Sequence, residues 1–312
     1  MNSPAQILPI NATEPKPLSR SGQVSEPSSW QAFLKLCIDR KPQKTRLARC
    51  RHQGPLYVQR PFYPEGPHLP HIYLLHPPGG VVSGDLLDID LDIQTDAHAL
   101  FTTPGAGRVY RARPDKTPQG QNVTITVAPG GSAEWFPLEN ILYPKANAKL
   151  STKVYLGEGA RFSGWDITSL GLPAQGDLFS SGKLNQRLEI WSGGSPKIIE
   201  CLAFNGEDDF ASSLAGLQNY PINGTFVAGP FATSPMNENG ECIVEKMREI
   251  GALPRHRDLE SMDGVSFVNN FIVGRYLGQC SESAKNLFTQ YWQLLRPVLI
   301  GRPACLPRIW ST

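Results

Sequence analysis

Apolar and polar residues alternate along much of this chain, and the alternation is strictest over residues 87–93, where aspartates separate leucines and isoleucines. A period of two is typical of a β-strand with one buried face. A short polar turn leads to a second strand-like segment, residues 99–103, which ends at Pro104 and Gly105. These features predict a β-hairpin that follows the Pro/Gly-rich corner at residues 76–80.

The same unit recurs along the chain. Each copy joins two strand-like segments through a turn rich in glycine or proline, and successive turns lie roughly thirty residues apart, a spacing typical of stacked repeats. The other pairs are residues 56–58 with 71–75, 122–127 with 133–136, 150–156 with 160–165, and 184–191 with 197–204. Hairpins that cannot bury a face alone are expected to stack. We therefore predict a mainly β fold in which stacked β-hairpins form a helicoidal, β-helix-like body with a few helices.

Weaker patterns fill the rest of the chain. We expect a short helix or a strand at residues 30–38, strands at 225–227 and 266–273, and a short helix at 242–250.

The clearest helix lies near the C-terminus. It has one apolar stripe, and we expect Ser281 to cap it and Pro297 to end it, because proline cannot continue the helical hydrogen bonds. Residues 1–29 are rich in proline, serine and asparagine. We expect them to be a flexible leader to a single domain, residues 30–312.

Composition narrows the class of protein. The net charge is only +2, and no run of Lys and Arg is interleaved with aromatic residues, so nucleic acid is not an expected partner. No apolar run approaches the ~20 residues of a membrane span, and no signal-peptide pattern is present. The six cysteines are scattered without a CxxC pair, which favours reduced thiols and a cytoplasmic location.

Three acidic residues lie among aromatic residues and turns, namely Glu134, Glu139 and Asp166. Carboxylates on adjacent hairpins can act as an acid/base pair, which would make the protein a β-helical carbohydrate-active enzyme. They can also offer oxygen ligands to a divalent cation in transit. A third interpretation is that each acid bonds a turn amide or stays in water. The residues alone leave these alternatives open.

Other chemical motifs are weak or absent. His68, His71 and His76 share one Pro-rich segment, but their spacing fits no zinc pattern and no cysteine is near them in the sequence, so we interpret them as loop and corner residues. The chain has no P-loop, GxGxxG or GxSxG motif. Nucleotide binding and serine-hydrolase chemistry are therefore not supported.

Two segments are candidate partner surfaces. Arg108, Tyr110 and Arg111 form a cationic aromatic cluster, which fits a partner contact or a solvated strand edge equally well. In the C-terminal helix, core packing is the favoured interpretation of the apolar stripe, and a partner surface is the alternative. The residues concerned are Tyr291, Trp292 and Leu295, followed in the tail by Ile309 and Trp310.

Several motifs, in order along residues 56–312, resemble the urease accessory protein UreD family, also called UreH. They begin with HPPGGVVSGD at residues 76–85 and TTPGAGRVYRA at 102–112. EWFPLENILY follows at 134–143, then GWDI and LGLPA, then RYLG and WQLLRP, and finally GRPA and PRIW. Leu138 and Leu172 depart from the family pattern, which puts individual contacts in doubt rather than the resemblance.

The resemblance implies a scaffold, not an enzyme. UreD proteins bind UreF, which holds the GTPase UreG, and dock this assembly on apo-urease for nickel insertion. The family allows a homodimer of the accessory complex and implies no tightly bound cofactor, only nickel in transit. It makes Glu134, Glu139 and Asp166 candidates for the lining of a nickel passage. It also leads us to expect that residues 291–310 meet UreF.

Overall fold

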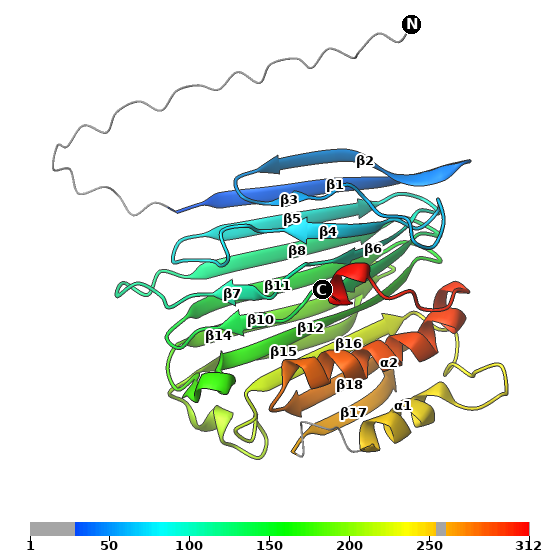
Figure 1. Cartoon of the computed structure of the whole chain (residues 1–312). Helices are drawn as coiled ribbons and strands as arrows, with labels where there is room; N and C mark the ends of the chain where they lie inside the picture. Colours follow the sequence, from blue (N-terminus) through cyan, green and yellow to red (C-terminus); the bar gives the residue numbers. More distant parts are fainter. Residues whose placement is uncertain (1–28, 254–259, 312) are drawn as a thin grey trace, which may run out of the picture.

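The computed structural model describes residues 29–253 and 260–311, so the predicted leader lies outside this part of the chain except for Ser29. Within it, two β-sheets pack face to face and two helices cover the outer face of one of them (Figure 1). The fold is mainly β, as predicted, and its sheets are mixed and not closed.

Sheet one has seven strands in the described residues, in the order β15-β14-β11-β8-β5-β1-β2. Strands β1, β5, β8, β11 and β14 are parallel, with antiparallel strands at the two edges. The bounds are β1 Gln31–Lys41, β2 Lys44–Gln53, β5 Leu86–Ile93, β8 Gln119–Val127, β11 Asn147–Leu156, β14 Lys183–Ser192 and β15 Ser195–Asn205.

Sheet two has eleven strands in the same part of the chain, with the main order β17-β18-β16-β12-β9-β6-β4-β3. Its long strands are β4 His71–Leu75, β6 His98–Thr102, β9 Ser132–Phe136, β12 Arg161–Leu172, β16 Ile222–Gly229, β17 Met262–Val268 and β18 Phe271–Gly278. Its short strands are β3 Tyr57–Val58, β7 Gly107–Val109, β10 Asn140–Leu142 and β13 Asp177–Leu178.

Three of the five predicted hairpins are arches instead. Strands β5 and β6 belong to different sheets, as do β8 and β9, and β11 and β12. Each strand pairs in parallel with its equivalent in the next unit, for example Ile89 with Val123 and Phe101 with Trp135. Both strands of a unit direct apolar residues at the same inter-sheet core, so they face each other across it instead of sharing hydrogen bonds. The body is therefore helicoidal, as predicted, but built from arches.

The arches turn at equivalent corners. Asp96, Gly130 and Gly159 occupy this position in three successive units, with φ of 54°, 68° and 65°. This left-handed conformation costs glycine little, and aspartate tolerates it better than most residues. The first and last predicted units are true antiparallel hairpins, β3 with β4 and β14 with β15.

The helices form the third layer. Helix α1 (Ile243–Ala252) and helix α2 (Ser281–Ile300) lie on the face of sheet two that points away from sheet one (Figure 1). The predicted stripe of α2 is buried against β12, β16 and β18, which confirms the core-packing interpretation. Short 3₁₀ helices occur at Pro173–Gln175, Asp209–Ala211 and Arg308–Ser311. No helix in the described residues has both the length and the apolarity that crossing a bilayer requires.

Both predicted ends of α2 need correction. The helix continues past Pro297 to Ile300 and ends at Gly301, whose N–H donates to the Pro297 carbonyl at 2.9 Å. Proline removes only one donor, and the carbonyl it would have bonded belongs to Gln293, on the exposed side of the helix. At the other end Cys280 is the N-cap residue, and Ser281 Oγ instead donates to Glu139 Oε1 at 3.1 Å.

Candidate functional site

Sheet two separates the predicted acidic residues. Successive residues of a strand point to opposite faces, and in β9 Trp135 joins the inter-sheet core while Glu134 faces α2. In β12, Trp165 packs on the α2 side and Asp166 lies between the sheets. Glu134 and Asp166 therefore lie on opposite faces of the same sheet, and the structure does not bring them together as a carboxylate pair.

A cavity of about 310 Å³ lies between the two sheets. Apolar residues from two clusters of the inter-sheet core line it, together with polar side chains and two connecting segments, residues 76–79 and 103–106. The polar side chains between the sheets are Gln119, Gln121, Thr152, Asp166 and Gln186. They make the cavity suitable for water or an ion rather than for an apolar ligand.

Asp166 is the acid of this cavity. Its burial raises the pKa of the carboxyl to about 6, against a smaller opposing effect of the Thr152 hydroxyl on β11. Near neutral pH the group can therefore exchange its proton for another cation. The indole N–H of Trp135, which lines the same cavity, also opposes the rise in the pKa of Asp166. Its Nε1 makes no hydrogen bond of ordinary length to a described residue.

Glu134 belongs to a different, largely buried cluster. Arg296 donates to both of its carboxylate oxygens at 2.9 Å, Trp292 Nε1 donates at 2.6 Å, and His98 Nε2 lies 3.0 Å away. Burial alone would raise the pKa of Glu134, but the His98 hydrogen bond and the Arg296 charge lower it to about 2. The carboxylate is permanently ionised and fully bonded, which is the pattern of a structural ion pair.

The cluster extends through Arg296 to a second carboxylate. Arg296 donates from Nη1 to Glu65 Oε2 at 2.6 Å and from Nη2 to Glu65 Oε1 at 2.8 Å, and it also bonds the Pro303 carbonyl. Glu65 Oε1 in turn lies 2.8 Å from His71 Nε2. We call the set His98, Glu134, Trp292, Arg296, Glu65 and His71 the Arg296 network.

Glu139 is only partly buried and lies immediately before β10. Its side chain bonds Ser281, and it is not among the residues that line the cavity, although its neighbours Leu138 and Asn140 are. Of the three predicted acidic residues, Asp166 is the one that lines the cavity.

The predicted partner residues divide into two groups. Arg108 and Arg111 are exposed, Tyr110 is half-buried, and Arg108 also lines the cavity. Tyr291, Trp292 and Leu295 are fully buried under α2, so in the single chain they pack the core and offer no surface. Ile309 and Trp310 are half-buried.

Trp310 holds the C-terminal tail against sheet two. Its ring lies 5.4 Å from that of Trp165, 6.2 Å from that of Trp292 and 6.3 Å from that of Phe136, measured between centroids. Its Nε1 donates to Thr102 Oγ1 at 3.0 Å. Within the single chain, Trp310 thus packs against sheet two and is only partly exposed.

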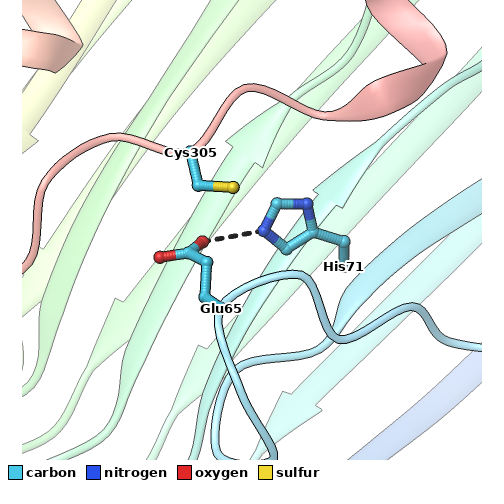
Figure 2. Close-up of side chains that lie close together, drawn as sticks. All are labelled: Glu65, His71 and Cys305. Atoms are coloured by element: carbon cyan, nitrogen blue, oxygen red, sulfur yellow. Dashed lines mark hydrogen bonds and ion pairs between the residues drawn. The ribbon is translucent and has the colours of Figure 1, made fainter.

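Sequence reasoning missed the partners that define the Arg296 network. Arg296 is 162 residues from Glu134 and 231 from Glu65, so no local spacing indicates their contact. It also missed Cys305, which the tail brings beside Glu65 and His71 (Figure 2). His71 is the first, fully buried residue of β4, which confirms the strand predicted at residues 71–75 and makes the loop interpretation of this histidine wrong.

Comparison with known proteins gives one consistent result. The family model described as UreD urease accessory protein matches residues 31–311. A urease accessory protein UreD of Marinomonas sp. (strain MWYL1) is 42% identical over 317 residues, covering 100% of both chains. Those of Alcanivorax borkumensis and Hahella chejuensis are 37% and 39% identical, covering 95% and 94% of this chain and 99% and 94% of their own lengths.

Proposed function

Because this chain belongs to the UreD family of urease accessory proteins, we propose that it acts in urease maturation as a non-catalytic scaffold that passes nickel to apo-urease. In this proposal it works in the cytoplasm, binds UreF, and through UreF the GTPase UreG. Six free cysteines fit a reducing compartment.

The inter-sheet cavity carries the proposal. Asp166, the one carboxylate that lines it among the described residues, and its amide and hydroxyl groups supply oxygen ligands of moderate strength for a divalent cation. An ion in transit must be bound well enough to enter and weakly enough to leave. One acid whose pKa is about 6 meets this requirement better than a closed set of several ionised ligands would.

Partner contacts are proposed at the loop end of the cavity. Arg108 lines the cavity and is exposed, and Tyr110 and Arg111 follow it on the surface. A cationic aromatic group of this kind suits a protein interface. The buried residues Tyr291, Trp292 and Leu295 would then hold α2 on sheet two and would not touch UreF.

The enzyme alternative gains no support from the geometry. A glycosidase needs two carboxylates on either side of one scissile bond. Here sheet two stands between Glu134 and Asp166, and Glu134 is held by Arg296.

The test is urease activation in cells at limiting nickel, with this chain replaced by Asp166→Asn or Asp166→Ala. We expect the nickel content and the activity of the purified urease to fall several-fold, while the variants still co-purify with UreF. The matched control is Asp90→Asn, an acid on the solvent face of sheet one. Normal nickel loading with both Asp166 variants would refute the passage through this cavity.

A further inference from the structure

Three potential metal ligands of different kinds meet on the helix side of sheet two. They are Glu65 in the loop between β3 and β4, His71 at the start of β4, and Cys305 in the tail after α2. One ligand atom of each lies within 4.8 Å of the other two. Figure 2 shows the Cys305 sulfur directed toward the gap between the Glu65 carboxylate and the His71 ring.

The group lies in a buried and charged place. The Glu65 carboxylate accepts from Arg296 at 2.6 and 2.8 Å, and Arg302 donates to the Glu65 backbone carbonyl at 3.2 Å. The Glu65 side chain is 8% exposed and that of His71 is fully buried. A divalent cation would bind here by displacing the proton of the Cys305 thiol, so that a thiolate and a carboxylate face the ion together.

The histidine is able to change its bonding. Its Nε2 now faces Glu65, and its Nδ1, although buried, has no hydrogen-bond partner in the described part of the chain. Because an ionised carboxylate can only accept, the ring proton lies on Nε2, and no described residue occupies Nδ1. Nε2 can therefore switch from donating to Glu65 to coordinating an ion, with the proton on Nδ1.

We propose that Glu65, His71 and Cys305 bind a divalent transition ion of borderline softness, Zn²⁺ or Ni²⁺. Carboxylate, imidazole and thiolate together are a ligand set that suits these ions and not Mg²⁺ or Ca²⁺. Glu65 would offer Oε1 to the ion and keep Oε2 on Arg296, which then orients the ligand from behind.

This site is separate from the inter-sheet cavity, because sheet two lies between them, and it does not depend on the proposed function. Its ligands come from a loop before β4, from β4 itself and from the C-terminal tail. A bound ion would therefore fasten the tail to the strand body.

The test uses Co²⁺ as the probe on the full-length chain, purified without a metal-binding tag and stripped with chelator. We expect one equivalent of Co²⁺ to produce a near-ultraviolet thiolate-to-cobalt absorption band, which Zn²⁺ or Ni²⁺ then abolishes by displacement. Cys305→Ser should remove this band and His71→Gln should weaken Co²⁺ binding at least tenfold. Cys280→Ser, a partly buried cysteine outside the cluster, is the matched control and should keep the band.

Thermal unfolding separates binding from damage to the fold. Serine nearly preserves the size of the side chain, so metal-free Cys305→Ser should melt with the wild type. A hundredfold excess of Zn²⁺ over its dissociation constant should raise the melting temperature of the wild type by about 5 °C and leave that of Cys305→Ser unchanged. Absence of the band in the wild type, or an equal band in Cys305→Ser, would overturn the proposal.

Discussion

Asp166 and Glu134 are buried acids on neighbouring strands, yet their pKa values move in opposite directions. No cation of the described residues contributes at Asp166, so burial dominates and raises its pKa to about 6. Glu134 is just as buried, but His98 and Arg296 more than offset the burial and lower its pKa to about 2. What distinguishes them is the charge of the neighbours that the fold supplies.

The stability of the protein should therefore depend on Asp166 in a defined pH range. A folded pKa of about 6 against the ordinary 3.8 means that this group stabilises the fold fully below pH 3.8, and that its contribution is lost as the pH rises through 6. Between pH 4 and pH 7.5 the free energy of unfolding of the wild type should fall by roughly 3 kcal/mol relative to Asp166→Asn. Urea unfolding at several pH values measures this difference. Parallel profiles of the two proteins would contradict the prediction, and Asp90→Asn should show no such trend.

Single residues were the hardest level to predict from the sequence. Glu134 was recognisable as unusual because it lies among aromatic residues, but its role depends on Arg296, 162 residues away. Cys305 and His71 are likewise distant in sequence and adjacent in space. Contacts of this kind arise from the stacking of layers, and no local pattern encodes them.

Among the elements, α2 adds to its buried apolar stripe a buried charged contact with the β-body, made by Arg296. Arg296 projects from its last turns and bonds Glu134 on β9 and Glu65 in the loop before β4. Its side chain is 1% exposed, and that of Glu134 is 2% exposed. Hydrogen-bonded guanidinium–carboxylate pairs of this geometry are hard to replace, because lysine cannot serve two carboxylates with a planar fork.

We expect Arg296→Met to lower the free energy of unfolding by about 3–5 kcal/mol, because it leaves two buried carboxylates without their cation. Arg296→Lys should restore only part of the loss. Arg275→Met is the control, since the Arg275–Glu200 pair on the surface is largely exposed and should contribute less than about 1 kcal/mol. Chemical denaturation measures all three, and equal losses for Arg275→Met and Arg296→Met would contradict the assignment.

Element types were largely predictable, whereas their pairing was not. Period-two alternation located the strands of the five repeated units, and helical spacing located α1 and α2. The ambiguous segment 30–38 proved to be strand β1, and a hairpin, β17–β18, replaced the single late strand. Hairpins and arches share the same alternation and the same turn residues, so the sequence alone cannot distinguish them. The two strands of such a unit form an arch because both bury their apolar residues in the core between the two sheets.

At the scale of the whole molecule, the edge strands of the open sheets must be kept from pairing with a second copy of the chain. Strand β2 is the outermost strand of sheet one, and it is mostly exposed. Arg46, Arg49 and Arg51 lie along it. Charged side chains on an edge strand oppose its pairing with a second copy.

We predict that Arg49→Val combined with Arg51→Val makes the protein associate with itself at micromolar concentrations. The reason is that a β-prone, uncharged edge strand would present free backbone hydrogen-bonding groups. Size-exclusion chromatography with light scattering at increasing concentration measures the association. Lys149→Val with Lys153→Val, on the interior strand β11 of the same sheet, is the matched control and should stay as dispersed as the wild type. An unchanged mass for the edge variant would contradict the prediction.

The placement of Glu134 and Trp135 on opposite faces of β9 has a consequence for the length of the chain. A strand has only two sides, so adding or removing one residue between Gly131 and Glu134 would move every following residue of β9 to the opposite face. The glutamate would then enter the space between the sheets and the tryptophan would meet the guanidinium. This stretch should therefore tolerate changes of residue type far better than any change in residue number.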